Sequence, residues 1–393
     1  MSLHKSILDF IVFSARPPLC ENILDYAIQR AWPVARIHDP FLLDIPVPRG
    51  CTDPALLNRY AMHSRMGFPA QFLICIPDGV SFGGGFIRLG SSEFLTESSW
   101  RPQYLLDSKI YRARFHRHKA HLQGDYMNLH AFFGGNYGHW LYDEIPRLFN
   151  SLKHLPQTTR FLVPEPLEPW KLDTLLAIGI AEDRLCRVPA YFEVHCERLW
   201  FATHLGDSEQ CVTAPDIASE VRNAFCNHFA VSSACSSPER IFVSRASVTH
   251  RRLANEDALR PVLDRYGFTI ISPEEFPVKE QVSMFANAKL VVGSFGAALT
   301  NIMFAPPGAT LIDLQDQIHA PRIWFWKLAN IYGHRYRTIV GRTVENRAWG
   351  DVRFVVSPEI LDTFITSSSE NTHSLDDVDW VSCSQLLAIN QKI

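Results

Sequence analysis

Three short stretches of the sequence gather side chains that can do chemistry. In the first, GGNYGHWLYDEIPRLFN at residues 134–150, His139 and Asp143 are four residues apart, so a helix would place both on one face. A carboxylate hydrogen-bonded to an imidazole fixes the tautomer of the ring and supports acid–base chemistry. The alternative is a buried structural histidine, with Asp143 in a helix salt bridge to Arg147, also four residues away. A metal site is disfavoured, because there is no His-Glu-x-x-His pattern.

The second stretch, KLVVGSFGAALTN at residues 289–301, has the pattern of a buried strand, a glycine turn and the start of a helix. Gly293 and Gly296 let the backbone approach a ligand closely, and Ser294 adds a hydroxyl donor. The N–H groups that open the helix near Ala297 can bind phosphate or carboxylate. An ordinary strand–helix turn with small residues for packing explains the pattern equally well, because Gly-Ser-Phe-Gly is neither a P-loop nor a complete dinucleotide motif.

The third stretch, VSRASVTHRRLANED at residues 243–257, is rich in arginine. Arg245 lies at the end of an expected strand, and Arg251 and Arg252 lie in the loop behind it. Arginine at the carboxyl end of a strand can point toward a ligand, and its forked donors suit a diphosphate. A solvated basic loop is the alternative. The glycine turn in the same half of the chain favours the phosphate interpretation, because two anion-binding features then converge.

These residues need a scaffold, which alternating strand and helix patterns supply in both halves of the chain. The first 120 or so residues are rich in strands and turns, beginning with the apolar run ILDFIVF, which is too short to cross a bilayer. Further along the N-terminal half, we expect a helix after the glycines up to Asn150, strands at 160–166, 184–189 and 191–205, and a helix at 170–180. In the C-terminal half, we expect strands at 240–245, 268–273, 289–292 and 309–315, and helices at 255–267, 278–288 and 323–333.

Such alternation predicts an α/β fold with two Rossmann-like, doubly wound domains facing a cleft, in which ligands bind at the carboxyl ends of the strands. We place the N-terminal domain at residues 1–215, the C-terminal domain at 216–345, and an extension at 346–393 that can pack back on the N-terminal domain. A length of 393 residues agrees with two domains.

Composition excludes several classes of protein. The formal net charge of −3 argues against a general nucleic-acid binder, which would be clearly basic. The nine cysteines are odd in number and include no Cys-x-x-Cys pair, which argues against a zinc site or a dense disulfide framework and fits a reducing compartment. No apolar run reaches the ~18 uncharged residues that a membrane-spanning helix needs.

In order and spacing, the three stretches resemble glycosyltransferase family 61. The resemblance lies in N-Y-G-H-W-L-x-D-x-x-P-R at 136–147, in S-R…R-R-x-x-N-E at 244–256, and in E-Q-V-x-x-F…V-V-G-x-x-G-A-A-L-T-N-x-x-F-A-P-P-G at 280–308. It covers about residues 130–315 and implies a two-domain fold of the B type (GT-B). It also implies an inverting, metal-independent transfer from a nucleotide sugar, with no cofactor.

The resemblance assigns roles within the C-terminal domain. The donor diphosphate would lie on the helix after Gly293–Gly296, held by Arg245 and by Arg251 or Arg252 in place of a metal ion. Phe295 stands where many members have a histidine, so a ring donor to phosphate is missing there. The spacing of Asp377 and Asp379 matches a metal-binding Asp-x-Asp motif, but both lie in a polar tail that is most simply a solvated segment. Asp313 is either a ribose contact or a turn residue.

The N-terminal domain would then bind the acceptor. His139 or Asp143 would be the base that takes the acceptor proton, with the imidazole as base and the carboxylate as its orienting partner. Asn136, Trp140 and Arg147 are assigned to the acceptor side. Trp140 either stacks on a sugar ring or packs as a buried aromatic, and Arg147 is expected to anchor Asp143 or Glu144 rather than sugar.

The predicted function is a glycosyltransferase that moves a sugar from a nucleotide-sugar donor to a glycan or polysaccharide acceptor, as the family's capsule and lipopolysaccharide enzymes do. The alternative is a non-catalytic sugar-nucleotide-binding or scaffold protein with the same fold. A nucleotide-sugar epimerase is disfavoured, because we find neither a dinucleotide motif near the N-terminus nor a Tyr-x-x-x-Lys pair. The expected location is the cytoplasm, with peripheral contact at the inner face of the membrane; nucleic acid is not expected as a partner.

Overall fold

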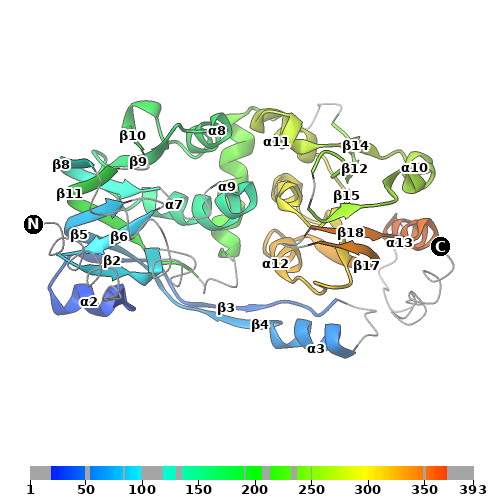
Figure 1. Ribbon diagram of the computed structural model, residues 1–393, viewed down its shortest axis with the longest axis horizontal. Helices are drawn as coiled ribbons and strands as arrows, with labels where there is room; N and C mark the ends of the chain where they lie inside the picture. The colour runs from blue at the N-terminus through cyan, green and yellow to red at the C-terminus, as the bar shows by residue number, and fades with distance from the viewer. Residues whose placement is uncertain are drawn as a thin grey trace, which may run out of the picture. The chain divides into compact units, whose positions relative to one another are not determined.

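The computed structural model describes residues 19–48, 54–82, 85–98, 118–129, 135–189, 192–205, 213–231, 237–248, 250–347 and 351–369. The chain divides into two compact units, which are described separately (Figure 1). Unit 1 contains Met1–Pro40 and Pro69–Cys211, and unit 2 contains Phe41–Phe68 and Val212–Ile393. The expected strand ILDFIVF and the tail with Asp377 and Asp379 lie outside the described residues.

Unit 1 is built on a nine-stranded mixed sheet. Its strands, in spatial order, are β1 (Leu19–Cys20), β7 (Glu93–Leu95), β6 (Phe86–Leu89), β5 (Gln71–Phe82), β11 (Phe192–Ala202), β8 (His118–Asn128), β9 (Arg160–Glu165) and β10 (Leu185–Pro189), with β2 (Val34–His38) also paired to β5. Its helical segments are α2 (Ile23–Gln29), η1 (Thr96–Ser98), α6 (Tyr137–His139), η3 (Trp140–Glu144), α7 (Ile145–Leu152), α8 (Pro169–Ala177) and η4 (Glu182–Arg184).

Only part of this sheet agrees with the predicted doubly wound pattern. Strands β8, β9 and β10 run parallel and are joined through the segments α6 to α7 and α8, as the β-α-β pattern predicts. Strand β5, in contrast, is antiparallel to β2, β6 and β11. The link from β5 to β6 is only three residues long, too short for the crossover that a parallel pair needs.

Unit 2 is built on a seven-stranded sheet. Its strands, in spatial order, are β13 (Arg252–Leu253), β18 (Val352–Val355), β17 (Arg335–Asn346), β16 (Thr310–Asp316), β15 (Leu290–Ser294), β12 (Arg240–Val243) and β14 (Thr269–Ile271). From β17 to β14 each strand is parallel to the next one in the sheet, whereas β18 is antiparallel to β17. Strands β15 and β16 are buried along their whole length. A strand buried on both faces needs apolar side chains at nearly every position, which explains the run LVV in β15.

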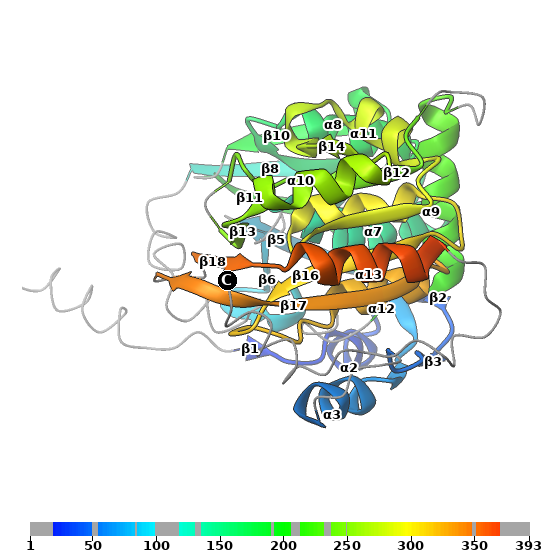
Figure 2. The same ribbon diagram turned by 90° about the vertical axis from the view of Figure 1, so that its right-hand side faces the viewer.

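Helices cover both faces of this sheet (Figure 2). On one face, α10 (Glu256–Arg265) and α13 (Pro358–Ser369) pack together, and their buried leucines and isoleucines join the strands in one core. The other helical segments are α9 (Pro215–His228), η5 (Pro273–Glu275), α11 (Val278–Phe285), η6 (Ala297–Phe304) and α12 (Trp324–Ile331). Segment η6 contacts α9, α11, α12 and β15, which forms the second layer. The predicted doubly wound arrangement is therefore confirmed for unit 2.

Residues 41–48 and 54–68 form an arm that belongs to unit 2 although the strands before and after it belong to unit 1. The arm consists of a two-stranded ribbon, β3 (Phe41–Asp44) and β4 (Arg65–Phe68), and the helix α3 (Pro54–Met62). The ring of Tyr60 packs edge-on against Trp326, with centroids 4.9 Å apart, and the Trp326 indole donates to the carbonyl of Pro46 at 3.1 Å. These contacts join residues that are far apart in sequence, so no local sequence pattern predicts them.

The predicted domain limits stay a prediction, and the compact units group residues 41–68 and the extension with the C-terminal half of the chain. The division within the chain near residue 212 lies close to the predicted limit at 215. In the described part of the extension, β18 pairs with β17 and β13, and α13 joins the core of unit 2. Among the described helices, none is long and apolar enough to cross a membrane.

Candidate functional site

Three neighbouring strands of unit 2 bring the predicted anion-binding residues together. Strands β12, β15 and β16 lie side by side, in a register that pairs Val243 with Gly293 and Gly293 with Asp313. Their carboxyl ends therefore open at the same edge of the sheet, where ligands of such folds bind. Arg245 follows β12, Gly296 follows β15, and the loop from Asp316 to Arg322 follows β16.

The two glycines of the turn have different roles. A β-carbon on Gly296 would lie 1.9 Å from Nη1 and 2.7 Å from Cζ of Arg245, so the guanidinium rests directly on this residue. A β-carbon on Gly293 would instead meet Val243 and Leu299, each at 2.9 Å, inside the packed sheet. Gly296 thus makes room for the arginine, whereas Gly293 serves the close packing that was the alternative for this motif.

Hydrogen bonds to backbone carbonyls fix the side chains of Arg245 and Arg251. Arg245 donates from Nε and Nη2 to the carbonyl of His250, at 3.2 and 2.8 Å, and Arg251 donates from Nε to the carbonyl of Phe295 at 2.9 Å. Arg251 has a φ of 54°, in the left-handed region that non-glycine residues seldom adopt. This turn directs Arg251 toward Phe295. The sequence left open whether Arg251 or Arg252 lies beside Arg245. Arg252 is in β13, which pairs with β18, whereas the charge of Arg251 acts on Arg245, so Arg251 is the neighbour of Arg245.

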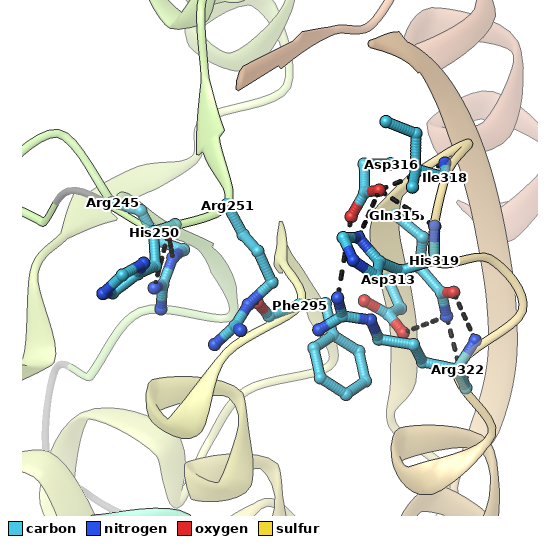
Figure 3. A network of polar contacts seen from close by, with 10 residues as sticks. All are labelled: Arg245, His250, Arg251, Phe295, Asp313, Gln315, Asp316, Ile318, His319 and Arg322. Carbon is cyan, nitrogen blue, oxygen red and sulfur yellow. Dashed lines mark hydrogen bonds and ion pairs between the residues drawn. The ribbon is translucent and has the colours of Figure 1, made fainter. Parts of the chain in front are cut away.

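A third arginine, Arg322, completes the cluster and was not anticipated from the sequence (Figure 3). The side-chain amide of Gln315 clamps its backbone: Arg322 N–H donates to Oε1 at 2.7 Å, and Nε2 donates to the Arg322 carbonyl at 2.9 Å. The guanidinium carbon lies 4.8 Å from the ring centroid of Phe295, and that of Arg251 lies 5.7 Å from the same centroid. A cation this close to an aromatic ring is stabilised by the ring's electrons.

The cluster carries more positive charge than its surroundings compensate. Burial, together with the charge of Arg251, lowers the pKa of both Arg245 and Arg322 to about 10. Among the described residues, the ion pairs of these three arginines are limited to that of Arg322 Nη2 with Asp316 Oδ2, at 4.0 Å. An arriving anion would offset this repulsion, so the arrangement suits a ligand with several negative charges, such as a diphosphate.

Asp313 does not take either of the roles expected for it. It is fully buried within β16, where its Oδ2 accepts hydrogen bonds from Gln315 at 2.8 Å and from the Tyr336 hydroxyl at 3.0 Å. Its Oδ1 has no hydrogen-bond partner in the described part of the chain, and burial raises the pKa of the carboxyl group to about 7. Asp313 is neither exposed to a ribose nor in a turn; it holds Gln315, and through it the backbone of Arg322.

The remaining predicted donor-side residues are less directly placed. Ser294 is the last residue of β15 and is buried. Ala297 begins η6, a 3-10 helix whose N-cap is Gly296. Phe295 is buried and packs edge-on against Phe325, with centroids 4.9 Å apart. Phe295 therefore supports the two guanidinium groups and offers no open aromatic face of its own.

In unit 1, the structure brings His139 and Asp143 together as predicted. Nδ1 of the imidazole lies 2.8 Å from Asp143 Oδ2, and both side chains are about one-tenth exposed, at 11% and 12%. Asn136 caps the helix, accepting from the N–H of His139 at 3.2 Å. The pair is therefore partly buried but reaches the surface of the unit, and its geometry matches a base with an orienting carboxylate.

A change of helix type occurs within this motif. Residues Trp140–Glu144 form a π-helix, in which the N–H of Ile145 donates to the carbonyl of Trp140. Pro146 has no N–H to bond the carbonyl four residues earlier, which weakens the ordinary α-helical pattern at this point. Single π-turns of this kind are rare and are frequent at functional sites.

Trp140 and Arg147, assigned to the acceptor side, have structural contacts. Trp140 is buried, and its indole donates to the hydroxyl of Thr174 at 2.8 Å, so the buried alternative describes it and sugar stacking does not. Arg147 forms an ion pair with Glu144 and donates to the carbonyl of Ala202 at 2.9 Å. Although burial opposes the shift, Arg147 holds the pKa of Glu144 below its usual range. Arg147 thus anchors Glu144, one of the two partners expected.

Comparisons with known proteins match a stretch of the chain that includes residues from both units. A family model described as Glycosyltransferase 61 matches residues 137–312, which include His139, Asp143, Arg245 and Gly296. The EGF domain-specific O-linked N-acetylglucosamine transferase of Drosophila melanogaster is 33% identical over 92 residues, which are 23% of this chain and 17% of that protein. The chain therefore matches less than a fifth of the length of this relative. The loop that carries Arg322 begins after the last residue matched by the family model.

Proposed function

We propose, because residues 137–312 match the family model described as Glycosyltransferase 61, that the chain transfers a sugar from a nucleotide-sugar donor to a glycan or polysaccharide acceptor. We further propose that the transfer inverts the anomeric configuration and needs no metal ion. The observation that carries the proposal is that Arg245 lies against Gly296 while Arg251 and Arg322 lie beside the ring of Phe295, at the edge of a parallel sheet where ligands of such folds bind.

The arginine cluster would serve the donor diphosphate. When the sugar leaves, negative charge develops on the diphosphate, and fixed guanidinium groups stabilise that charge without having to reorganise. In other enzymes a divalent cation does this work. No group of three or more metal-ligating side chains occurs among the residues the structure describes, and independence from metal remains a prediction.

The His139–Asp143 pair would supply the base. A hydrogen bond from Nδ1–H to the carboxylate of Asp143 places the imidazole lone pair on Nε2, which can take a proton from an acceptor hydroxyl. The acceptor oxygen would then attack the anomeric carbon from the face opposite the diphosphate. This gives inversion, and it requires the base and the donor site to reach the same substrates, as in the B-type fold.

The relative's name suggests which donor to test first. A nucleotide-activated N-acetylglucosamine is our first candidate, because the relative is an N-acetylglucosamine transferase. Its acceptor, an EGF domain, need not be the acceptor here, because the match covers 17% of that protein. A surface polysaccharide of the capsule or lipopolysaccharide type remains the predicted acceptor, and the cytoplasm remains the predicted location.

A donor panel tests the proposal. The full chain is incubated with nucleotide sugars, with and without EDTA, and hydrolysis or transfer is followed by release of the nucleoside diphosphate. We expect turnover that EDTA does not abolish, and a product whose anomeric configuration, measured by NMR, is opposite to that of the donor. Arg245→Ala should abolish donor binding, whereas Arg260→Ala, at an exposed arginine of α10, should not. Binding without turnover on every acceptor tested would support the non-catalytic alternative.

A further inference from the structure

The loop after β16 carries a second Asp–His pair, outside the residues that match the family model. Asp316, the last residue of β16, accepts three hydrogen bonds at Oδ1: from the N–H of Ile318 at 3.2 Å, from the N–H of His319 at 3.0 Å, and from Nδ1 of His319 at 2.8 Å. One carboxylate oxygen therefore fixes both the backbone of the loop and the plane of the imidazole.

This pair adjoins the arginine cluster. The other oxygen of Asp316 lies 4.0 Å from Nη2 of Arg322, so His319 and Arg322 share one carboxylate. Figure 3 shows the imidazole of His319 beside Asp316, on the side of Arg322. The Asp316 side chain is 3% exposed, whereas that of His319 is 34% exposed, so the carboxylate is enclosed and the ring can be reached from solvent.

The charges around the ring favour an anion beside it. The charged groups that act on Asp316, the partner of His319, are the guanidinium groups of Arg322 and Arg251, and the buried carboxyl group of Asp313 acts on both arginines. An imidazolium donates from both ring nitrogens, so with Nδ1 turned to Asp316 it can donate from Nε2 to a phosphate oxygen. A neutral ring with its proton on Nδ1 cannot.

We propose that His319, oriented by Asp316, donates a hydrogen bond from Nε2 to the diphosphate of the donor. His319 would thereby be a catalytic residue that stabilises the leaving group. Since His319 would serve the donor diphosphate, its role rests on the proposed function. As the acceptor oxygen bonds to the anomeric carbon, the bond from that carbon to the diphosphate oxygen breaks, and its electron pair stays on the diphosphate. The acceptor proton goes to the base in unit 1. His319 keeps its proton and stabilises the charge of the departing group.

Two substitutions separate the two nitrogens of the ring. His319→Asn retains an amide donor near the position of Nδ1, which can still bond Asp316, and removes the donor at Nε2. His319→Gln places a neutral donor near the position of Nε2. His228→Gln is the matched control, because His228 is an exposed histidine of α9 in the same unit. Arg245→Ala reports on the donor site itself.

The test is calorimetric titration of the full chain with inorganic pyrophosphate, free of any nucleotide or sugar, at pH 6 and pH 8.5. At pH 6 we expect His319→Asn to weaken binding on the order of tenfold and His319→Gln by about threefold, with His228→Gln unchanged. The difference between wild type and His319→Asn should be smaller at pH 8.5 than at pH 6, because only an imidazolium donates from both ring nitrogens. A purely structural histidine would not give this dependence on pH and on which nitrogen is retained.

The outcomes distinguish this role from the proposed function. If the wild type binds pyrophosphate, Arg245→Ala does not, and His319→Asn binds as tightly as wild type at both pH values, the donor site stands and the role of His319 is overturned. A difference that is equal at pH 6 and pH 8.5 also overturns it. If the wild type binds neither pyrophosphate nor any nucleoside diphosphate, both the donor site and the role of His319 fail.

Discussion

Replacing Gly296 with alanine should weaken anion binding without unfolding the protein. The new β-carbon would lie 1.9 Å from Nη1 of Arg245, and real β-carbons essentially never approach another heavy atom within 3.0 Å, so the guanidinium must retreat from its place. The backbone itself tolerates the change, because a φ of 178° is an extended conformation that any residue adopts. The atoms displaced are the far end of a flexible side chain, which can move without disturbing the core.

The size of the effect follows from what Arg245 would lose. A hydrogen bond to a charged group contributes about 1.5–3 kcal/mol, so losing one such bond to the diphosphate weakens binding roughly 10- to 150-fold. The free energy of unfolding should stay within about 1 kcal/mol of wild type, since alanine restricts the unfolded chain slightly more than glycine does. Calorimetric titration with pyrophosphate and nucleoside diphosphates measures the first quantity, and urea denaturation measures the second.

Gly293→Ala is the matched control, with the opposite expectation. Its β-carbon would meet Val243 and Leu299 at 2.9 Å and the Val243 carbonyl at 3.1 Å, inside the sheet. Overpacking of this kind costs about 1–3 kcal/mol of stability. The folded fraction should keep its affinity for pyrophosphate. If Gly296→Ala binds as wild type does, Arg245 is not a ligand of the anion. If Gly293→Ala is fully stable but does not bind, the turn itself contacts the ligand.

Three further outcomes are expected. His139→Ala should spare pyrophosphate affinity and lower kcat on the order of 10²- to 10⁴-fold, measured by transfer assay; unchanged kcat would remove the imidazole from the mechanism. Arg322→Lys should weaken pyrophosphate binding by about tenfold in titration, because lysine keeps the charge but loses the planar fork that stacks on Phe295. Asp313 has its folded pKa raised from 3.8 to about 7, so its contribution to stability is present below about pH 4 and is lost as pH rises toward 7. The free energy of unfolding, measured by urea denaturation, should therefore fall by up to ~4 kcal/mol across that pH range in the wild type, and Asp313→Asn should make this fall much smaller. An unaltered pH profile in the variant would show that another group titrates.

The fold of unit 2 was largely predictable, because the residue pattern of each central strand and helix indicates which of its faces are buried. Strands such as LVV in β15 are apolar on both faces, and the helices between them show the expected spacing and end at glycine or proline. Resemblance to family 61 was likewise visible in motifs that are contiguous in sequence, and the family model confirms it. The pairing of His139 with Asp143 followed from a spacing of four residues.

Unit 1 and the arm were less predictable, because their defining contacts are between distant segments. Whether β5 pairs parallel or antiparallel depends on its neighbours in the sheet, and an apolar run of strand length is compatible with both. The packing of Tyr60 on Trp326 joins residues more than two hundred positions apart. Nothing in the composition of either segment indicates the other as its partner.

The sequence by itself determined which short motifs could do chemistry: a histidine with a carboxylate one turn away, a glycine turn after a buried strand, and an arginine at the end of another strand. Only the tertiary structure decided which of those residues meet. The order of β12, β15 and β16 places Arg245 on Gly296 and adds Arg322, Asp316 and His319 from a loop with no recognisable motif. The physical reason is that spacing along the chain fixes contacts within one helix or turn, whereas contacts across a sheet depend on which strands become neighbours.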